Sequence, residues 1–120
     1  MPARNDALTD RLSRYRQITI SVTGRKSGRT TSRPVWFVLE DDQLYLLPVQ
    51  GSDTQWYKNV LKSPSMQIAA RGAEAEFKAV PITDAPRVSS VVEKFRDKYG
   101  AGDVKKYYSK FDVAVLAQRR

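Results

Sequence analysis

The residues best suited to chemistry form a basic loop, Thr23-Gly24-Arg25-Lys26-Ser27-Gly28-Arg29, between two predicted β-strands. Glycine lets the backbone turn and expose its N–H groups, while arginine and lysine supply charge and donors that suit phosphate or carboxylate. The loop therefore predicts an anion-binding site. The same residue types also form an ordinary solvated turn, so the loop alone leaves both interpretations open.

A second candidate feature is the segment 50–59, Gln-Gly-Ser-Asp-Thr-Gln-Trp-Tyr-Lys-Asn, in which a glycine precedes the start of a predicted helix. Helix N-termini attract anions, and Trp56 and Tyr57 in the first turn could support a planar ring. The alternative is that both aromatics belong to the core, because they lie at helical spacing from Val60 and Leu61.

The composition restricts the chemistry further, because the 120 residues include no histidine and no cysteine. Histidine is the commonest acid–base side chain near neutral pH and the commonest metal ligand. Its absence excludes Ser-His-Asp and Cys-His hydrolases and limits any metal site to carboxylate and amide ligands. Without cysteine there is no disulfide and no thiolate metal site. If the protein is an enzyme, we expect a bound cofactor to carry the reaction.

The chain is a basic protein, with a formal net charge of +8 that favours acidic partners: nucleic acid, a membrane surface or a small polyanion. No segment approaches the ~20 apolar residues of a membrane span. The polar start, residues 1–6, lacks the apolar centre of a signal peptide. A cytoplasmic location is therefore the default expectation.

The elements that would position these residues are read from hydrophobic periodicity and turn residues. Ile18, Ile20 and Val22 alternate with hydroxyl residues, which is typical of a half-buried strand. Further strands are expected at 31–39, 43–47, 66–70, 75–82 and 111–117, and helices at 5–15, 54–62 and 86–99. Asp41-Asp42 predicts a hairpin turn, Gly100-Ala101-Gly102 a helix break, and 103–110 a basic turn or helix. Six short, mostly antiparallel strands favour a small barrel, because closure removes exposed edges.

The order of these elements resembles the split-barrel flavin- or deazaflavin-dependent oxidoreductases, in particular the deazaflavin-dependent nitroreductase family. The resemblance runs from about Ile18 to Ile68 and has two motifs in the family's order. The first is Gly-Arg-Lys-Ser-Gly at 24–28, before the hydrophobic strand at 34–39. The second is Gly51 followed by Trp-Tyr-Lys-Asn-Val at 56–60 and the turn Ser63-Pro64. The C-terminal part is similar in layout only.

The resemblance implies a mainly β protein with helices (α+β), a six-stranded antiparallel split β-barrel of the FMN-binding split-barrel type. Residues 1–120 would form a single domain: an N-terminal helix at 1–15, barrel strands with one short helix at 16–82, a helical segment at 86–110 and the last strand at 111–117. The implied cofactor is coenzyme F-420, an 8-hydroxy-5-deazaflavin, with FMN as the alternative. The implied activity is hydride transfer to a small organic acceptor, and the implied assembly is a homodimer.

The family's site residues can be carried over onto matching positions. The cofactor's phosphate or acidic tail would contact Arg25, Lys26, Ser27, Gly28, Arg29 and Arg33. Val35 and Trp36 would lie beside its ring, and Gly51 with Ser52 would approach the ring edge through backbone. Trp56 and Asn59 would also bind the cofactor, and substrate would contact Tyr107, Tyr108 and Tyr99. No protein nucleophile or metal is implied.

Two other functions stay open. One is a basic barrel that binds single-stranded nucleic acid, since cations combined with stacking aromatics bind single strands. Its candidate stacking residues are Trp36, Trp56, Tyr57, Tyr107 and Tyr108. The other is a cofactor-free split-barrel protein that binds an apolar ligand or a partner subunit.

Overall fold

The computed structural model describes residues 16–40, 43–70 and 72–119. The helix predicted at 5–15 and the turn predicted at 41–42 lie outside these residues. The described strands are β1 (Ile18–Thr23), β2 (Thr30–Val35), β3 (Phe37–Glu40), β4 (Gln43–Leu46), β5 (Ser65–Ala70), β6 (Ala73–Ile82) and β7 (Ala114–Arg119). The helices are η1 (Gly51–Asp53), α2 (Gln55–Lys62), α3 (Ala85–Tyr99) and α4 (Ala101–Tyr107).

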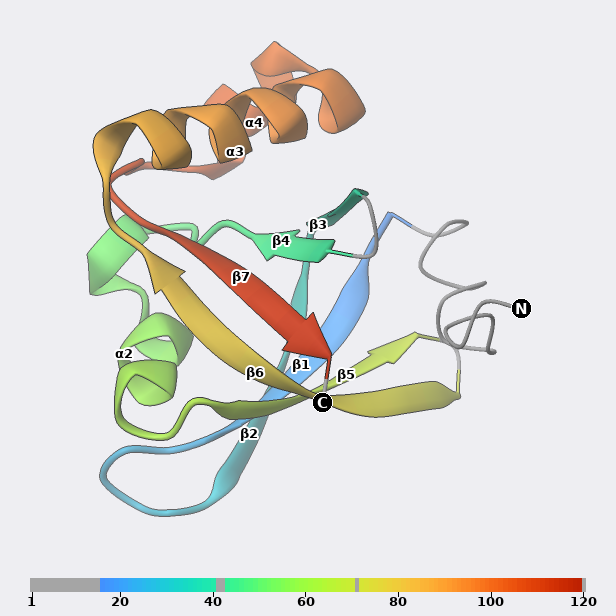
Figure 1. Ribbon diagram of the computed structural model, residues 1–120, viewed down its shortest axis with the longest axis vertical. Helices are drawn as coiled ribbons and strands as arrows, with labels where there is room; N and C mark the ends of the chain where they lie inside the picture. The colour runs from blue at the N-terminus through green and yellow to red at the C-terminus, as the bar shows by residue number, and fades with distance from the viewer. Residues whose placement is uncertain (1–15, 41–42, 71, 120) are drawn as a thin grey trace.

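The strands form one antiparallel sheet in the order β2-β1-β5-β6-β7-β4-β3. Figure 1 shows that this sheet is strongly curled, with α3 and α4 at the top and α2 at the lower left, above the loop that joins β1 and β2. The mixed α+β class and the antiparallel half-barrel agree with the sequence-based prediction. Within the described residues, no helix has the length and apolar character needed to cross a membrane.

The predicted count of six strands is wrong, because the strand expected at 31–39 breaks at Trp36. Its first part, β2, pairs with β1, and its second part, β3, pairs with β4. β2 and β3 therefore stand at opposite ends of the strand order while only Trp36 separates them along the chain. The sheet must curl until its two ends meet at this residue.

Two smaller predictions near the C-terminus also need correction. Only Gly100, with φ of 95°, interrupts the helical segment, whereas Ala101 and Gly102 belong to α4. The last strand begins at Ala114 rather than Phe111. The residues between α4 and β7 instead contact η1, as described below.

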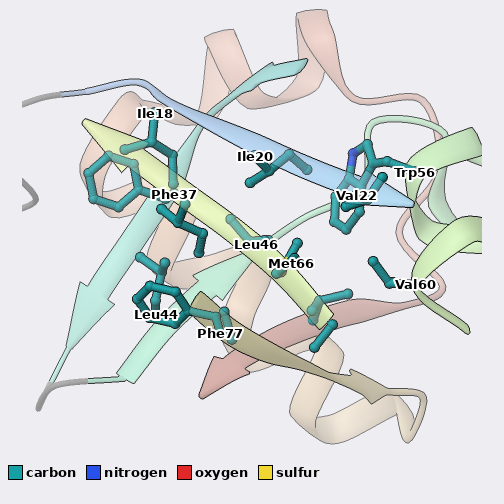
Figure 2. Packing of buried hydrophobic residues seen from close by; sticks show 14 of the residues in the cluster. Ile18, Ile20, Val22, Phe37, Leu44, Leu46, Trp56, Val60, Met66 and Phe77 are labelled. Carbon is teal, nitrogen blue, oxygen red and sulfur yellow. The ribbon is translucent and has the colours of Figure 1, made fainter. Parts of the chain in front are cut away.

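The curled sheet encloses a first apolar cluster, the barrel core, shown in Figure 2. The predicted alternation of β1 is confirmed, since Ile18, Ile20 and Val22 are all buried there. Each large apolar side chain that is fully buried contributes about 1.5–3 kcal/mol. The barrel core also contains Trp56, Tyr57 and Val60 of α2.

A second apolar cluster fills the space between the sheet and α3. The predicted helix at 86–99 is confirmed as α3, whose apolar residues at helical spacing, Val88, Val91, Val92 and Phe95, are all buried in this cluster. α3 begins with Asp84, whose carboxylate accepts a hydrogen bond from the Arg87 N–H at 3.2 Å and caps the helix. The partly buried Trp36 packs against this cluster, at the junction of the two sheet ends.

Candidate functional site

An apolar pocket of about 370 Å³ lies at the junction of β2 and β3. This volume is within the range of small-molecule sites. One side comes from Pro34, Val35 and Trp36, and another from Tyr107 and Tyr108 at the end of α4. Gln17, Leu47 and Val49 complete the lining. The fold thus brings two predicted ring-contacting residues beside two predicted substrate tyrosines.

The indole of Trp36 is the centre of an aromatic cluster. It stacks on Tyr99 with ring centroids 4.2 Å apart and planes at 7°. Tyr107 meets it edge to face at 5.5 Å, and Tyr108 lies at 5.9 Å. Aromatic pairs of this kind add about 0.5–1.5 kcal/mol each beyond the area that they bury. Trp36 therefore sits between α3 and α4 and forms a fixed part of the pocket wall.

Tyr99 lies behind Trp36 and does not line the pocket. Its hydroxyl accepts a hydrogen bond from the Phe37 N–H at 3.1 Å. The hydroxyl proton can be donated to the carbonyl oxygen of Arg16 at 2.7 Å or of Phe37 at 2.9 Å. Burial raises the pKa of Tyr99 to about 12, although the Phe37 hydrogen bond and the Arg16 charge oppose the increase. The phenol is therefore neutral at ordinary pH.

Tyr108 is 6% exposed and lines the pocket, whereas Tyr107 is 52% exposed. Within the described ranges, no residue forms a hydrogen bond with the Tyr108 hydroxyl. Burial, with a smaller effect of Tyr99, raises the pKa of Tyr108. Its hydroxyl therefore stays protonated and remains available as a donor.

The basic loop is anchored to α2 rather than open on all sides. The side-chain oxygen of Asn59 accepts hydrogen bonds from Arg25, and the Arg25 guanidinium also donates to Gln55 Oε1 at 2.8 Å. Lys62 Nζ donates to the Arg25 carbonyl at 3.0 Å. Three further backbone N–H groups, those of Gly24, Gly28 and Arg29, are bonded within the loop. Arg25 and these N–H groups are thus already engaged in holding the loop's shape.

Three cations near the loop keep their charge exposed. The side chains of Lys26, Arg29 and Arg33 make no ion pair with any carboxylate in the part of the chain that the structure describes. Arg33 pairs in register with Ile20 and Val35 with Ile18, so Arg33 and Val35 project from the same face of the sheet. The loop and the pocket lie at opposite ends of β2, separated by about 20 Å for six residues. Arg33 lies between them.

Of the predicted ring-contacting residues Gly51 and Ser52, Ser52 is bound to a residue that the sequence did not indicate, while the Gly51 N–H donates to the Pro48 carbonyl at 3.1 Å. Ser52 donates from its N–H to Asp112 Oδ1 at 2.9 Å and from its hydroxyl to Asp112 Oδ2 at 2.6 Å. Lys110 Nζ lies 3.1 Å from Asp53 Oδ2 and 3.7 Å from Asp112 Oδ2. Slight burial would raise the pKa of Asp112, but these hydrogen bonds and the Lys110 charge lower it. Sixty positions separate Ser52 from Asp112, and no sequence motif connects them.

These contacts fasten segment 49–53 to segment 109–112, and we call the arrangement the clasp. Val49 also takes part, because its carbonyl accepts a hydrogen bond from the Ser109 N–H at 2.9 Å. Gly51 has a φ of 56°, and a Cβ there would lie 2.1 Å from Asp112 Oδ1. The clasp thus requires glycine at 51. It joins the two segments that bring Val49 and Tyr108 to the pocket.

The second sequence motif is largely structural in its observed contacts. Trp56 and Tyr57 are buried in the barrel core, so the core interpretation of this pair is confirmed, but Leu61 is 53% exposed and does not join them. Asn59 is buried and holds Arg25. The structure does not bring Trp56 or Asn59 to the pocket lining. Burial of Trp56, Tyr57 and Tyr108 also does not favour stacking on nucleic-acid bases.

The curled antiparallel sheet whose two ends meet at Trp36 has the split-barrel fold. The chain belongs to the family described as "Uncharacterized protein conserved in bacteria (DUF2255)", whose model matches residues 9–115. A search of curated proteins found no match.

Several solved structures are similar to the whole fold. One is an F420-H2-dependent reductase (FDR-A), with 17% identity, 86% of this chain and 94% of that chain covered, and a TM-score of 0.66. An F420 reductase has 15% identity, coverage of 100% and 96%, and a TM-score of 0.68. HutZ, a heme storage protein from Vibrio cholerae, has 11% identity, coverage of 93% and 87%, and a TM-score of 0.70. At these identities the likeness concerns the fold.

Proposed function

We propose that this protein is an oxidoreductase that binds coenzyme F-420, or alternatively FMN, and transfers hydride to a small organic acceptor. The observation that carries the proposal is the pocket, where Val35 and Trp36 meet Tyr107 and Tyr108 from a distant part of the chain. The resemblance assigns the first pair to the cofactor ring and the second pair to substrate. Their convergence on one apolar cavity supports both assignments together.

The residues present suit such a cofactor. The apolar lining and the indole of Trp36 suit a planar ring. The Tyr108 hydroxyl, to which no described residue is bonded, can donate to a polar ring atom. Arg33, Arg29 and Lys26 supply cations for a phosphate or a carboxylated tail. Arg25 has the supporting role of fixing the loop on α2. Because the Ser52 donors are bonded to Asp112, we assign the Ser52 N–H no contact with the ring.

Hydride transfer is the chemistry that either cofactor supplies when bound, and it needs no histidine or cysteine. The chain's own contribution is to hold ring and acceptor face to face and to exclude water from the space between them. The Tyr108 phenol, kept neutral by burial, donates a hydrogen bond to the bound molecule. These roles need rigid walls, which the aromatic cluster and the clasp provide.

The proposal is tested by titrating the purified protein with F-420 and with FMN while following cofactor fluorescence. Saturable binding of either at micromolar concentration supports it, and the absence of saturable binding of both would overturn it. The reduced form of the cofactor that binds is then mixed with a quinone or nitroaromatic acceptor. Oxidation of the cofactor must be faster with the protein than without it.

A second candidate is binding of an apolar ligand without redox chemistry. It is favoured by the pocket lining, which includes no charged side chain among the described residues. A fluorescent apolar probe that binds the wild-type protein and is not displaced by F-420 or FMN would favour this function.

A homodimer belongs to the same proposal. Val49 and Tyr107 line the pocket yet are 43% and 52% exposed, so a second subunit could cover them. Light scattering of the purified protein should give a mass near twice that of one chain. A mass equal to one chain would remove the dimer and leave the cofactor proposal intact.

A further inference from the structure

We infer that Tyr99 is a positioning residue: its hydroxyl fixes the backbone where β2 passes into β3, and its ring fixes the indole of Trp36 as a wall of the pocket. The part that concerns ligand affinity rests on the proposed function. The part that concerns Trp36 itself does not.

The first step concerns the backbone at the junction. Trp36 belongs to neither β2 nor β3, so it lies at an interruption of the strand ladders. The next residue, Phe37, places its N–H on the Tyr99 hydroxyl at 3.1 Å and its carbonyl 2.9 Å from the same hydroxyl. The phenol accepts from the Phe37 N–H, as a neighbouring strand would, and its single proton is shared between the carbonyls of Phe37 and Arg16, which lie 2.9 and 2.7 Å away.

The second step concerns the indole. The Tyr99 ring lies parallel to Trp36 at 4.2 Å, a spacing and orientation that limit the indole's movement. Trp36 lines the pocket, and Tyr99 does not. Tyr99 therefore acts on any ligand of the pocket through Trp36.

The third step concerns what holds Tyr99. Its ring lies 5.9 Å from Phe95, within α3, and 5.0 Å from the Arg16 guanidinium carbon. The neighbouring Lys98 donates from Nζ to the Phe37 carbonyl at 2.8 Å. Lys98 and Tyr99, consecutive residues at the end of α3, thus both lie within hydrogen-bond distance of the Phe37 carbonyl. The position of α3 therefore sets the position of Trp36 in the pocket wall.

The test uses Trp36 as its own reporter. The chain has two tryptophans, so Trp56→Phe leaves Trp36 as the sole tryptophan, which is excited selectively over the tyrosines at long wavelength. In that background we compare Tyr99→Phe, which removes the hydroxyl and keeps the ring, with Tyr45→Phe. Tyr45 is the matched control, because among the described residues its hydroxyl bonds to the exposed Gln43 side chain alone, at 2.9 Å, and it does not line the pocket. The readouts are acrylamide quenching of Trp36 and the affinity for F-420 and FMN.

Tyr99→Phe should make Trp36 more accessible to acrylamide and weaken the affinity about fivefold to tenfold, because a buried N–H loses its acceptor. Tyr45→Phe should change neither. A purely structural role would lower the urea midpoint and leave quenching and affinity of the folded protein unchanged, and that result would overturn the inference. If the parent protein binds neither cofactor, the proposed function fails while the quenching comparison still decides the role of Tyr99.

A second measurement covers the case in which Tyr99→Phe does not fold, even in sucrose, which favours the folded state. Proton NMR of the Trp56→Phe protein should show indole protons of Trp36 shifted upfield by the ring stacked on them. Coil-like shifts for these protons would show that Tyr99 does not hold the indole, and would overturn the inference.

Discussion

The side-chain oxygen of Asn59 accepts two hydrogen bonds from Arg25, one from its backbone N–H at 3.1 Å and one from Nη1 at 2.8 Å. Asn59 is only 7% exposed, so the hydrogen-bond acceptor for the Arg25 donors comes from a residue buried in the fold. The basic loop and the Trp-Tyr-Lys-Asn helix, which are separate motifs in the sequence, are therefore one structural unit. This pairing explains on physical grounds why both motifs occur in one chain.

Replacing Asn59 tests that unit. Asn59→Ala should lower the free energy of unfolding by about 1–3 kcal/mol, because the Arg25 N–H loses its acceptor in a partly buried place. Asn59→Asp is the matched control, since it keeps an oxygen acceptor and adds attraction to the guanidinium. Urea unfolding measures both variants. An equal loss of unfolding free energy in the two variants would show that the hydrogen bonds from Arg25 to residue 59 do not stabilise the fold.

The geometry of the clasp predicts that a side chain at position 51 lowers the stability of the fold. Gly51→Ala and Gly72→Ala both place a side chain at positive φ, 56° and 87°, which costs roughly 1–2 kcal/mol. Only at Gly51 would the new Cβ also meet Asp112, at 2.1 Å, while Gly72 has nothing within 4 Å. We therefore expect Gly51→Ala to be clearly the more destabilising change in urea unfolding.

A double-mutant cycle isolates the contact between the two residues of the clasp. Adding Asp112→Ala to Gly51→Ala should cost less than the sum of the two single changes, because the shortest contact, to Asp112 Oδ1, disappears with the carboxylate, and the next, to Lys110 Cγ, is 2.9 Å. Additive costs would contradict the geometry of the clasp.

Stability should depend on pH in two opposite steps in the alkaline range. Burial, with a smaller effect of Arg16, lowers the pKa of Lys98 from 10.5 to about 8. Between these values the unfolded chain binds the proton and the folded chain does not, so stability rises with pH. Tyr99 has its pKa raised from 10.0 to about 12, so the unfolded chain loses its proton first and stability falls above pH 10.

Urea midpoints at about pH 7.5, 9.5 and 11 should therefore rise and then fall. Lys98 still adds stability up to pH 10.5, and the fall includes Tyr108, whose pKa burial also raises above that of the unfolded chain. Lys98→Met should flatten the rise and leave the fall, whereas Tyr99→Phe should reduce the fall. A rise that persists unchanged in Lys98→Met would show that another group titrates.

The exposed cations should govern the affinity for the anionic part of the cofactor. Arg29→Ala and Arg33→Ala should each weaken binding by about 1.5–3 kcal/mol if each makes a charged contact. Arg87→Ala is the control, because Arg87 lies on α3 beside Asp84, at 3.8 Å. Cofactor fluorescence titrations measure the three variants. Equal affinities for all three variants would show that Arg29 and Arg33 do not contact the bound cofactor.

The regular elements were largely predictable from local patterns. β1 and the apolar stripe of α3 follow from simple periodicity, and Gly100 marks the end of α3. The break at Trp36 was not predictable, because an unbroken apolar run from Val35 to Leu39 continues through it. The hydroxyl that bonds at this break belongs to Tyr99, 62 positions after Phe37.

The candidate site was predictable only in part. Val35, Trp36, Tyr107 and Tyr108 were expected from the resemblance and do meet in the pocket. Asp112 was missed, since a single carboxylate carries no signal of the serine that it will bind 60 positions away. Such long-range polar contacts depend on the completed fold rather than on local sequence.

The most direct test of the central claim, that the pocket at Trp36 holds a redox-active ring, is a titration of the Trp56→Phe protein followed by tryptophan emission. Added F-420 or FMN should quench Trp36 saturably, with the same dissociation constant that cofactor fluorescence gives, because a ring in this pocket touches the indole. Saturable cofactor binding without any change in Trp36 emission, or no binding at all, would contradict the claim.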